Sequence, residues 1–297
     1  MTSAMQRGIA LFAALTRFNA PAEEVRPALK LASPRITEAS GIAASLRHPG
    51  ALWIVNDSGA GPELHLVGED GADRGSVALR NTRNRDWEDL ASFEWKGRPY
   101  LLVADTGDNA SKHEMCSLVV VAEPSVGKDG RLLAGNVAAA WKIDFRYEDG
   151  PRDCESVAVD PAAGTILLLS KRTAPPALYE LPLVPGTQAP QTAKRIGETR
   201  AERPGGTLLP FGNQPTGMDV SPDASRAAIV TYNGWFLVVR GEGETWSAAF
   251  ARGAVWQGPH LLPQAESIAF SRDGSEVFLT SEGTHPKLLR FPVVELR

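Results

Sequence analysis

The chain has 297 residues, which suits one large β domain or two ordinary ones. Its formal net charge is −4 and its basic residues are dispersed, so it lacks the basic stripe that nucleic-acid binding requires. Hydrophobic residues make up 43% of the chain, enough for a sizeable core, yet no stretch reaches the roughly 20 apolar residues of a membrane span.

Residues 1–24 form a separate N-terminal segment. Arg7 precedes an apolar run over residues 8–15, which has the size of the hydrophobic region of a signal peptide. Arg17 follows closely, and residues 18–22 match a signal-peptidase cleavage site only loosely. The segment can therefore be interpreted either as a signal peptide or as a short surface helix. We therefore predict a periplasmic or secreted protein, with a cytoplasmic one as the alternative, and a β domain over residues 25–297.

Two short phrases recur along this domain, and together they predict pairs of strands. The first phrase occurs at residues 39–43, 87–91, 154–158, 215–219 and 265–269. The second occurs at residues 55–59, 103–107, 169–173, 230–234 and 279–283. Repeats of roughly 40 to 60 residues built from short strands are typical of β-propeller blades.

Apolar runs between turn residues predict four strands in most repeats. The strands expected in the second, third and fourth repeats are 89–94, 100–105, 117–122, 138–145; 156–160, 165–170, 178–183, 194–197; and 217–221, 227–232, 235–240, 246–251. The last repeat has only three, at 267–270, 276–280 and 287–294. A strand at residues 25–32 can supply the fourth, which closes the ring and removes exposed sheet edges. We predict a single all-β propeller of five blades, with six as the alternative because the spacing around the third repeat is wide.

The first phrase begins the innermost strand of each repeat, so its side chains should converge on the propeller axis. Its second position is Ser40 in the first copy and Thr216 in the fourth, but it is an acid in the other three, namely Glu88, Glu155 and Glu266. The second phrase returns to the same rim and adds Asp57, Asp105, Asp108 and Asn109. Oxygen-rich sets of this kind suit Ca²⁺, or alternatively Mg²⁺, better than zinc. The competing interpretation is that the acids bond neighbouring blades and line a water-filled axis.

Further rim residues are candidates for catalysis or ligand binding. Lys171 is a lysine among acids, so it can either orient an anionic or carbonyl substrate or neutralise Glu155 or Glu88 as an ion pair. Glu88, Glu155 and His285 are the candidate bases, although His285 also suits an ordinary surface loop. The residues expected to contact a ligand are Asn56, Trp87, Tyr232 and Glu282. A Gly-x-Ser-x-Gly motif is missing, which argues against a hydrolase of the serine-elbow type. Cys116 and Cys154 are expected to be buried thiols.

Several motifs together resemble a group of predicted bacterial β-propeller proteins, many exported and few of assigned function. The motifs are residues 39–42 with 52–59, 84–89, 105–109, 153–156, 216–221 and 266–270. The chain is also loosely similar to the SdiA-regulated five-bladed propellers and, more distantly, to calcium-dependent lactonases and esterases of the gluconolactonase and paraoxonase type. Ser40 and Thr216 depart from the metal-ligand pattern of those lactonases, so the resemblance carries over the fold better than the chemistry.

These observations lead to one expectation about function and one alternative. We expect a monomeric, calcium-dependent hydrolase of a lactone, ester or phosphoester, with the cation at the axial mouth and no nucleic-acid partner. The alternative is a non-catalytic propeller that binds a small ligand or a protein. An open axial mouth would favour the enzyme, and a mouth plugged by side chains would favour the binding protein.

Overall fold

The computed structural model describes residues 28–133, 135–185, 189–207, 209 and 211–294. The described chain is all-β apart from one short helix, and its strands form four sheets. The first sheet runs β2 (Ala39–Ala44), β3 (Ala51–Asn56), β4 (Glu63–Gly68), β5 (Asp73–Arg80) and β9 (Asn136–Ala138). The second has eight strands in the order β11 (Val157–Asp160), β12 (Thr165–Leu169), β13 (Ala177–Pro182), β14 (Gln191–Glu198), β10 (Trp141–Tyr147), β8 (Cys116–Ala122), β7 (Arg98–Asp105) and β6 (Trp87–Trp95).

The other two sheets have four strands each. One runs β15 (Pro215–Val220), β16 (Arg226–Thr231), β17 (Gly234–Val239) and β18 (Val255–Gly258). The other runs β19 (Ala265–Phe270), β20 (Glu276–Ser281), β21 (Lys287–Pro292) and β1 (Leu29–Lys30). The eight-stranded sheet consists of two antiparallel units, β6–β7–β8–β10 and β11–β12–β13–β14, which are joined by a parallel pairing of β10 with β14. β9 adds to the edge of the first sheet through a similar parallel pairing with β5.

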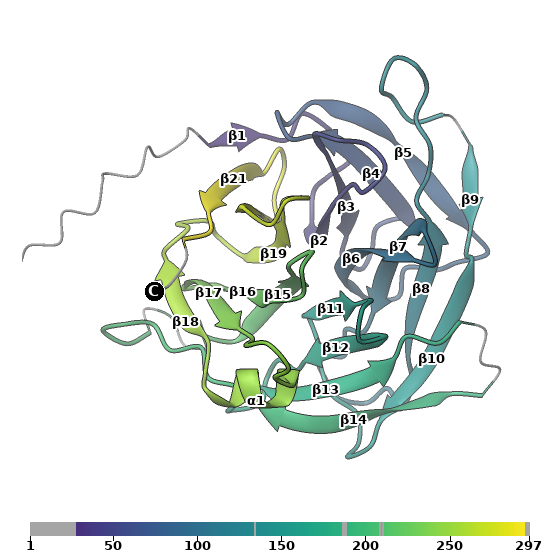
Figure 1. Ribbon diagram of the computed structural model, residues 1–297. Helices are drawn as coiled ribbons and strands as arrows, with labels where there is room; N and C mark the ends of the chain where they lie inside the picture. The colour runs from purple at the N-terminus through teal and green to yellow at the C-terminus, as the bar shows by residue number, and fades with distance from the viewer. Residues whose placement is uncertain (1–27, 134, 186–188, 208, 210, 295–297) are drawn as a thin grey trace, which may run out of the picture.

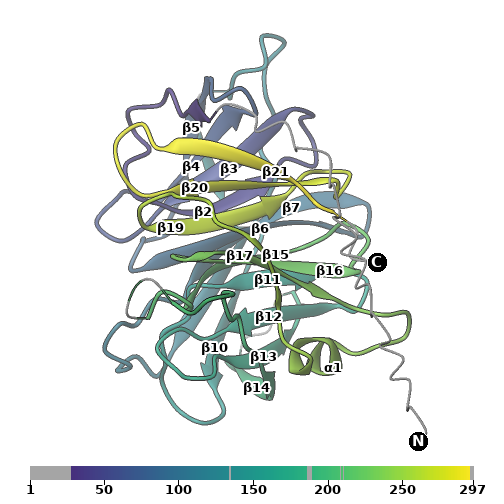
Figure 2. The ribbon, with the colours of Figure 1, turned by 90° about the vertical axis from the view of Figure 1, so that its left-hand side faces the viewer.

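The sheets radiate from a central axis, as in a β-propeller (Figure 1). The innermost strands β2, β6, β11, β15 and β19 pack against one another around this axis, and the side view shows them in the middle of the molecule, between β5 at one end and β14 at the other (Figure 2). Nearly every residue of these strands is buried because each strand lies between two neighbouring sheets. We number the antiparallel units in chain order by their innermost strands, β2, β6, β11, β15 and β19. Within the described residues the core divides into five hydrophobic clusters, each formed between two successive units or between the last and the first. Burial between sheets therefore holds the ring together.

The N-terminal strand was expected over residues 25–32, and its described part pairs with the last blade strand. β1 runs antiparallel to β21, with Leu29 opposite Leu288. Leu31 and Ile36, which follow β1, are fully buried in the cluster between the last and first units. Residues 1–24, and with them the predicted signal segment, lie outside the described residues, as do residues 25–27.

The strand predicted at 246–251 is wrong, because this segment is helix α1 (Trp246–Ala251). Thr245 precedes it as an N-cap, since its hydroxyl accepts a hydrogen bond from the backbone N–H of Ala248. Trp246 and Phe250 are both buried, and their spacing of four residues places them on one face of the helix, although the same spacing would also place them on one face of a strand. β18, which follows the helix, is the outer strand. In the described part of the chain, no helix is long and apolar enough to cross a membrane.

Candidate cation site at one mouth of the propeller

A β-bulge marks the start of four of the innermost strands. The pairing of each strand with its neighbour shifts by one residue there, and the unpaired residues are Ser40, Glu88, Thr216 and Glu266. Glu155 occupies the corresponding position immediately before β11. A bulge leaves one residue outside the ladder and redirects its side chain. The repeated position in the sequence is therefore a bulge position, and this explains why it can be polar at the head of an otherwise apolar strand.

At two of the five positions the bulge residue bonds the neighbouring unit. The Ser40 hydroxyl donates to the carbonyl oxygen of Trp87 at 2.7 Å, and the Thr216 hydroxyl donates to that of Ala265 at 2.6 Å. Both side chains are buried. The expectation that this position bonds adjacent blades therefore describes Ser40 and Thr216, and the three glutamates remain to be explained.

Glu88 lies at the centre of a cluster of carboxylates. One oxygen from each of Asp57, Asp86 and Glu88 lies within 4.8 Å of the others, and the same holds for Glu88, Asp153 and Glu155. Glu88 is only 5% exposed. Burial raises the pKa of Glu88 well above its usual value, and the charge of Glu155 raises it further. Among the described residues, the Glu88 carboxylate has neither a hydrogen-bond donor nor an ion-pair partner.

Two basic side chains neutralise the part of the cluster formed by Asp153 and Glu155. The Lys171 ammonium bonds the Glu155 carboxylate, and the Arg172 Nε atom lies 2.7 Å from Asp153 Oδ2. Burial raises the pKa of Glu155 to about 7, although the positive charge of Lys171 opposes this shift. Of the two roles predicted for Lys171, the structure thus contains the ion pair with Glu155.

Lys171 also connects this ion pair to Glu266 through Tyr232. Its Nζ atom lies 3.4 Å from the Tyr232 hydroxyl, which in turn donates to Glu266 Oε1 at 2.6 Å. Burial raises the pKa of Glu266 to about 9, with a further contribution from the charge of Glu155. Glu282, closer to the rim, accepts a hydrogen bond from the Gln264 side chain at 2.7 Å. The structure therefore brings Glu155, Lys171, Tyr232 and Glu266 together as one hydrogen-bonded chain.

Three predicted metal ligands lie beside the cluster and are engaged elsewhere. Asp105 accepts a hydrogen bond from the backbone N–H of Asp86 at 3.0 Å and lies 3.5 Å from Arg85 Nε. Asp108 accepts from the backbone N–H of His113 at 2.7 Å, and Asn109 accepts from Arg172. These contacts support the loops around the mouth.

The remaining predicted residues have structural contacts. The Asn56 amide bonds the backbone of Thr37, Glu38 and Arg35, which fastens the segment before β2. Trp87 is fully buried in the cluster between the first two units. The His285 ring lies 3.0 Å from the carbonyl oxygen of Leu31, next to the closing strand. The structure therefore does not bring these three residues into the carboxylate cluster.

Asp86 and Asp153 are site residues that the sequence analysis missed. Each precedes its glutamate by two positions, so the same Asp-x-Glu spacing occurs at Asp86 to Glu88 and at Asp153 to Glu155. This shared spacing was visible in the sequence, and it would have found both residues.

Asp89, which directly follows Glu88 in β6, is a third residue that was not predicted from the sequence. Its fully buried Oδ2 atom accepts hydrogen bonds from the backbone N–H groups of Val157 at 2.7 Å and Met218 at 3.2 Å. One carboxylate thus connects the innermost strands of three units. The corresponding positions in the other repeats hold only small residues, Gly41, Ser156, Gly217 and Ser267. Asp89 therefore occupies space at the axis that the other repeats leave free.

Asp219 makes a similar contact between the last two units, and it leads to a prediction about pH. Its carboxylate accepts backbone hydrogen bonds from Phe270 at 2.8 Å and Val220 at 2.9 Å, and burial raises its pKa from 3.8 to about 7. The folded state then retains a proton that the unfolded state releases, so stability should fall as the pH rises from about 4 to 7 and then level off.

The contribution of Asp219 is up to about 4 kcal/mol across that range. Urea unfolding at several pH values, with the wild type compared to Asp219→Asn, measures it. The carboxylates of Asp219 and Asp89 interact electrostatically. The difference in unfolding free energy between the wild type and Asp219→Asn therefore separates the contribution of Asp219 from that of Asp89. A difference between the two proteins that does not vary between pH 4 and 7 would contradict the prediction.

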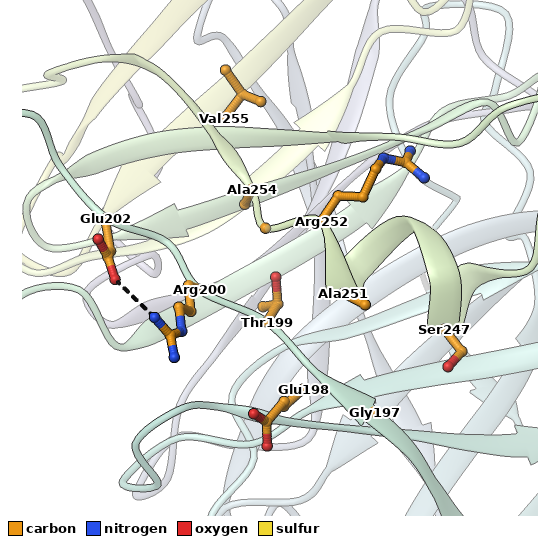
Figure 3. Close-up of a pocket in the computed structure, with 11 residues that line it drawn as sticks. Gly197, Glu198, Thr199, Arg200, Glu202, Ser247, Ala251, Arg252, Ala254 and Val255 are labelled. Carbon is orange, nitrogen blue, oxygen red and sulfur yellow. Dashed lines mark ion pairs between the residues drawn. The ribbon is translucent and has the colours of Figure 1, made fainter.

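One surface pocket lies away from this mouth, at the outer side of the third and fourth units. It has a volume of about 520 Å³ and is lined by residues 197–200, 202, 247 and 251–255 (Figure 3). Arg200 and Glu202 form an ion pair of 4.0 Å on its wall. None of the site residues predicted from the sequence lines it, so the candidate site remains the carboxylate cluster.

Comparisons with known proteins give structural similarity only. No protein-family model matches the sequence, and the search of curated proteins also gave no match. Similar solved structures include the Kuenenia stuttgartiensis hydrazine synthase, at 10% identity and a TM-score of 0.42, covering 86% of this chain and 72% of that one. They also include U3-55K, at 11% identity and a TM-score of 0.40, covering 86% of this chain and 68% of that one. A third is the Neurospora crassa Pan2 WD40 domain, at 8% identity and a TM-score of 0.36, covering 87% of this chain and 64% of that one.

Proposed function

We propose that this protein is a calcium-dependent hydrolase that acts on a lactone, ester or phosphoester at the axial mouth of its propeller. The observation that carries the proposal is Glu88, a buried carboxylate that lies among four other acids and has no neutralising partner among the described residues. Several carboxylates are costly to bury together unless a cation compensates their charge.

The residues present fit a divalent cation. Every donor in the cluster is a carboxylate oxygen, which suits Ca²⁺ and, as the alternative, Mg²⁺. Glu88, with neighbouring acids of the cluster, would hold it. A cation bound there supplies Lewis-acid polarisation of a carbonyl or phosphoryl oxygen and lowers the pKa of water.

The chain's own side chains provide the other functions that hydrolysis needs. Lys171 carries a positive charge that can orient a carbonyl or phosphoryl oxygen entering the mouth, and Tyr232 and Glu155 hold its ammonium in place. Glu155 has a pKa of about 7, so its carboxylate is suited to accept a proton near neutral pH.

A screen of lactones, aryl esters and phosphoesters in the presence of calcium tests this proposal. We expect turnover that a chelator abolishes, and a loss of about 100-fold or more in Glu155→Gln, which removes the candidate base. Lys171→Met should have a comparable effect, while Asp144→Asn, on the outer strand β10, serves as a control that leaves turnover unchanged. If the folded, cation-loaded wild type turns over none of these substrates, the proposal fails.

A non-catalytic binding protein is the second candidate, and one observation favours it. The Lys171 ammonium is already engaged by Glu155 and Tyr232, so side chains fill part of the mouth without a ligand. An intact cation site without turnover on any of the substrate classes would favour this candidate.

We further infer that the ring has five blades and that β1 closes it, which is supported by the five clusters between units and by the pairing of β1 with β21. Our proposal for the location is the periplasm or the outside of the cell, which rests on the apolar run at residues 8–15. We also propose that the ligand is a small molecule and that the protein is a monomer.

A further inference from the structure

The two halves of the carboxylate cluster differ in how their charge is compensated. Asp153 and Glu155 each contact a basic side chain, Arg172 and Lys171 respectively. Among the described residues, the Asp57 carboxylate accepts a hydrogen bond only from the backbone N–H of its neighbour Ser58, and the carboxylates of Asp86 and Glu88 have no donor. The negative charge that lacks compensation is therefore concentrated in Asp57, Asp86 and Glu88.

We propose that a single divalent cation binds between Asp57, Asp86 and Glu88, rather than among Glu88, Glu155 and Glu266 as the sequence repeat predicted. This inference rests on the proposed cation dependence and specifies its site. Three carboxylates whose oxygens lie within 4.8 Å of one another repel each other, and a bound cation reverses that repulsion. A cation beside Asp153 and Glu155 would instead lie against the positive charges of Arg172 and Lys171, which opposes binding.

Gly107 supports this placement independently of the charges. A Cβ atom built at this position would collide with the carboxylate oxygens of Glu88 and Asp86. Gly107 is not among the residues with positive φ, so its backbone conformation does not require glycine. Its missing side chain instead leaves room for two carboxylates to converge, while its N–H holds the Asp86 carbonyl at 3.2 Å.

The three acids also differ in exposure in a way that suits a cation site. Glu88 is buried, whereas Asp57 and Asp86 are half-buried. The cation can therefore reach its ligands from solvent at the mouth, and Glu88 provides an anchor away from water. Burial strengthens the attraction of Glu88 for a cation because the local dielectric constant is lower there.

Isothermal titration calorimetry of the full-length protein with calcium alone tests the site. We expect one calcium per chain, and an increase in Kd of about tenfold or more in Asp86→Asn and Glu88→Gln, because each removes a charged ligand. Gly107→Ala should weaken binding similarly, because it displaces the two carboxylates. The matched controls are Glu266→Gln and Gly61→Ala, where the added methyl group meets only ordinary contacts; both should stay within about threefold of the wild type.

Thermal unfolding gives a second readout that does not depend on affinity. In a chelator, Asp86→Asn and Glu88→Gln should melt at or above the wild-type temperature, because they relieve repulsion. In saturating calcium the wild type should melt higher than both, because only its folded state binds the cation.

The outcomes distinguish this site from the proposed function. Weak binding in Glu266→Gln with normal binding in Asp86→Asn would overturn the placement and leave cation dependence standing. Calcium bound at the proposed site without turnover of any substrate would overturn only the hydrolase. If the wild type binds neither calcium nor magnesium, the placement and the cation dependence both fail.

Discussion

A chain that begins at residue 37 is expected to unfold at a temperature about 10 to 20 °C lower than a chain that begins at residue 28. The deletion removes β1 and the fully buried side chains of Leu31 and Ile36. Each of these side chains contributes about 1.5 to 3 kcal/mol by burial, and further stability is lost with the backbone bonds to β21. The deletion also exposes the outer edge of β21 and should promote aggregation.

Calorimetric melting of the two chains measures the effect. If the shorter chain is not recovered folded, Leu31→Ala and Ile36→Ala in the longer chain test the same contacts, with an expected loss of about 2 to 5 kcal/mol each. Exposed Leu29→Ala is the control, because its side chain is not in the buried cluster. Equal melting temperatures for the two chains would show that the N-terminal strand does not close the ring.

Replacing Asp89 with alanine should cost roughly 2 to 6 kcal/mol of unfolding free energy, because it leaves the buried N–H groups of Val157 and Met218 without an acceptor. The loss exceeds that of an ordinary surface carboxylate because these groups belong to the innermost strands of two other units. Asp89→Asn keeps one acceptor oxygen and should lose less.

Urea unfolding measures this cost, and amide hydrogen exchange locates it. Exchange at Val157 and Met218 should accelerate in Asp89→Ala more than exchange at residues of the outer strands. Asp144→Ala on β10 is the control, since its side chain is 47% exposed. A loss below about 1 kcal/mol would mean that water replaces the carboxylate at the axis.

The fold could be anticipated because the period of the repeat and the alternation of strands and turns depend on local residues. The inner strands begin where the repeated phrase predicted them, at Ala39, Trp87, Pro215 and Ala265. The outer part of the fourth unit was predicted less well, since Trp246 and Phe250 are compatible with a strand or a helix and the Thr245 cap decides between them. The parallel pairings β10–β14 and β5–β9 join segments distant in sequence, and no local pattern encodes them.

The site was predicted in part. The repeat located Glu88, Glu155 and Glu266, because equivalent positions of successive units face one axis. It did not reveal Asp89, because the other copies hold only glycine or serine at that position. Asp86 was overlooked although its spacing from the glutamate recurs at Asp153. The pairing of Lys171 with Glu155 was foreseen only as one of two options, since the choice depends on distances between units that a sequence does not contain.

The parallel ladder between β10 and β14 makes the ring unequal in its resistance to opening. It joins the second and third units at their outer edges, so these two sheets share one continuous backbone network and would separate only by breaking it. The third and fourth units instead meet at the rim through an isolated bridge between Ala201 and Ala254 and through hydrogen bonds such as that from the Thr199 hydroxyl to the Phe250 carbonyl oxygen, beside the pocket of Figure 3. These two units would therefore separate without breaking a continuous backbone ladder, and such a motion would carry Tyr232 with the fourth unit. In this way a motion at the outer rim can alter the contact between Tyr232 and Lys171 at the axis.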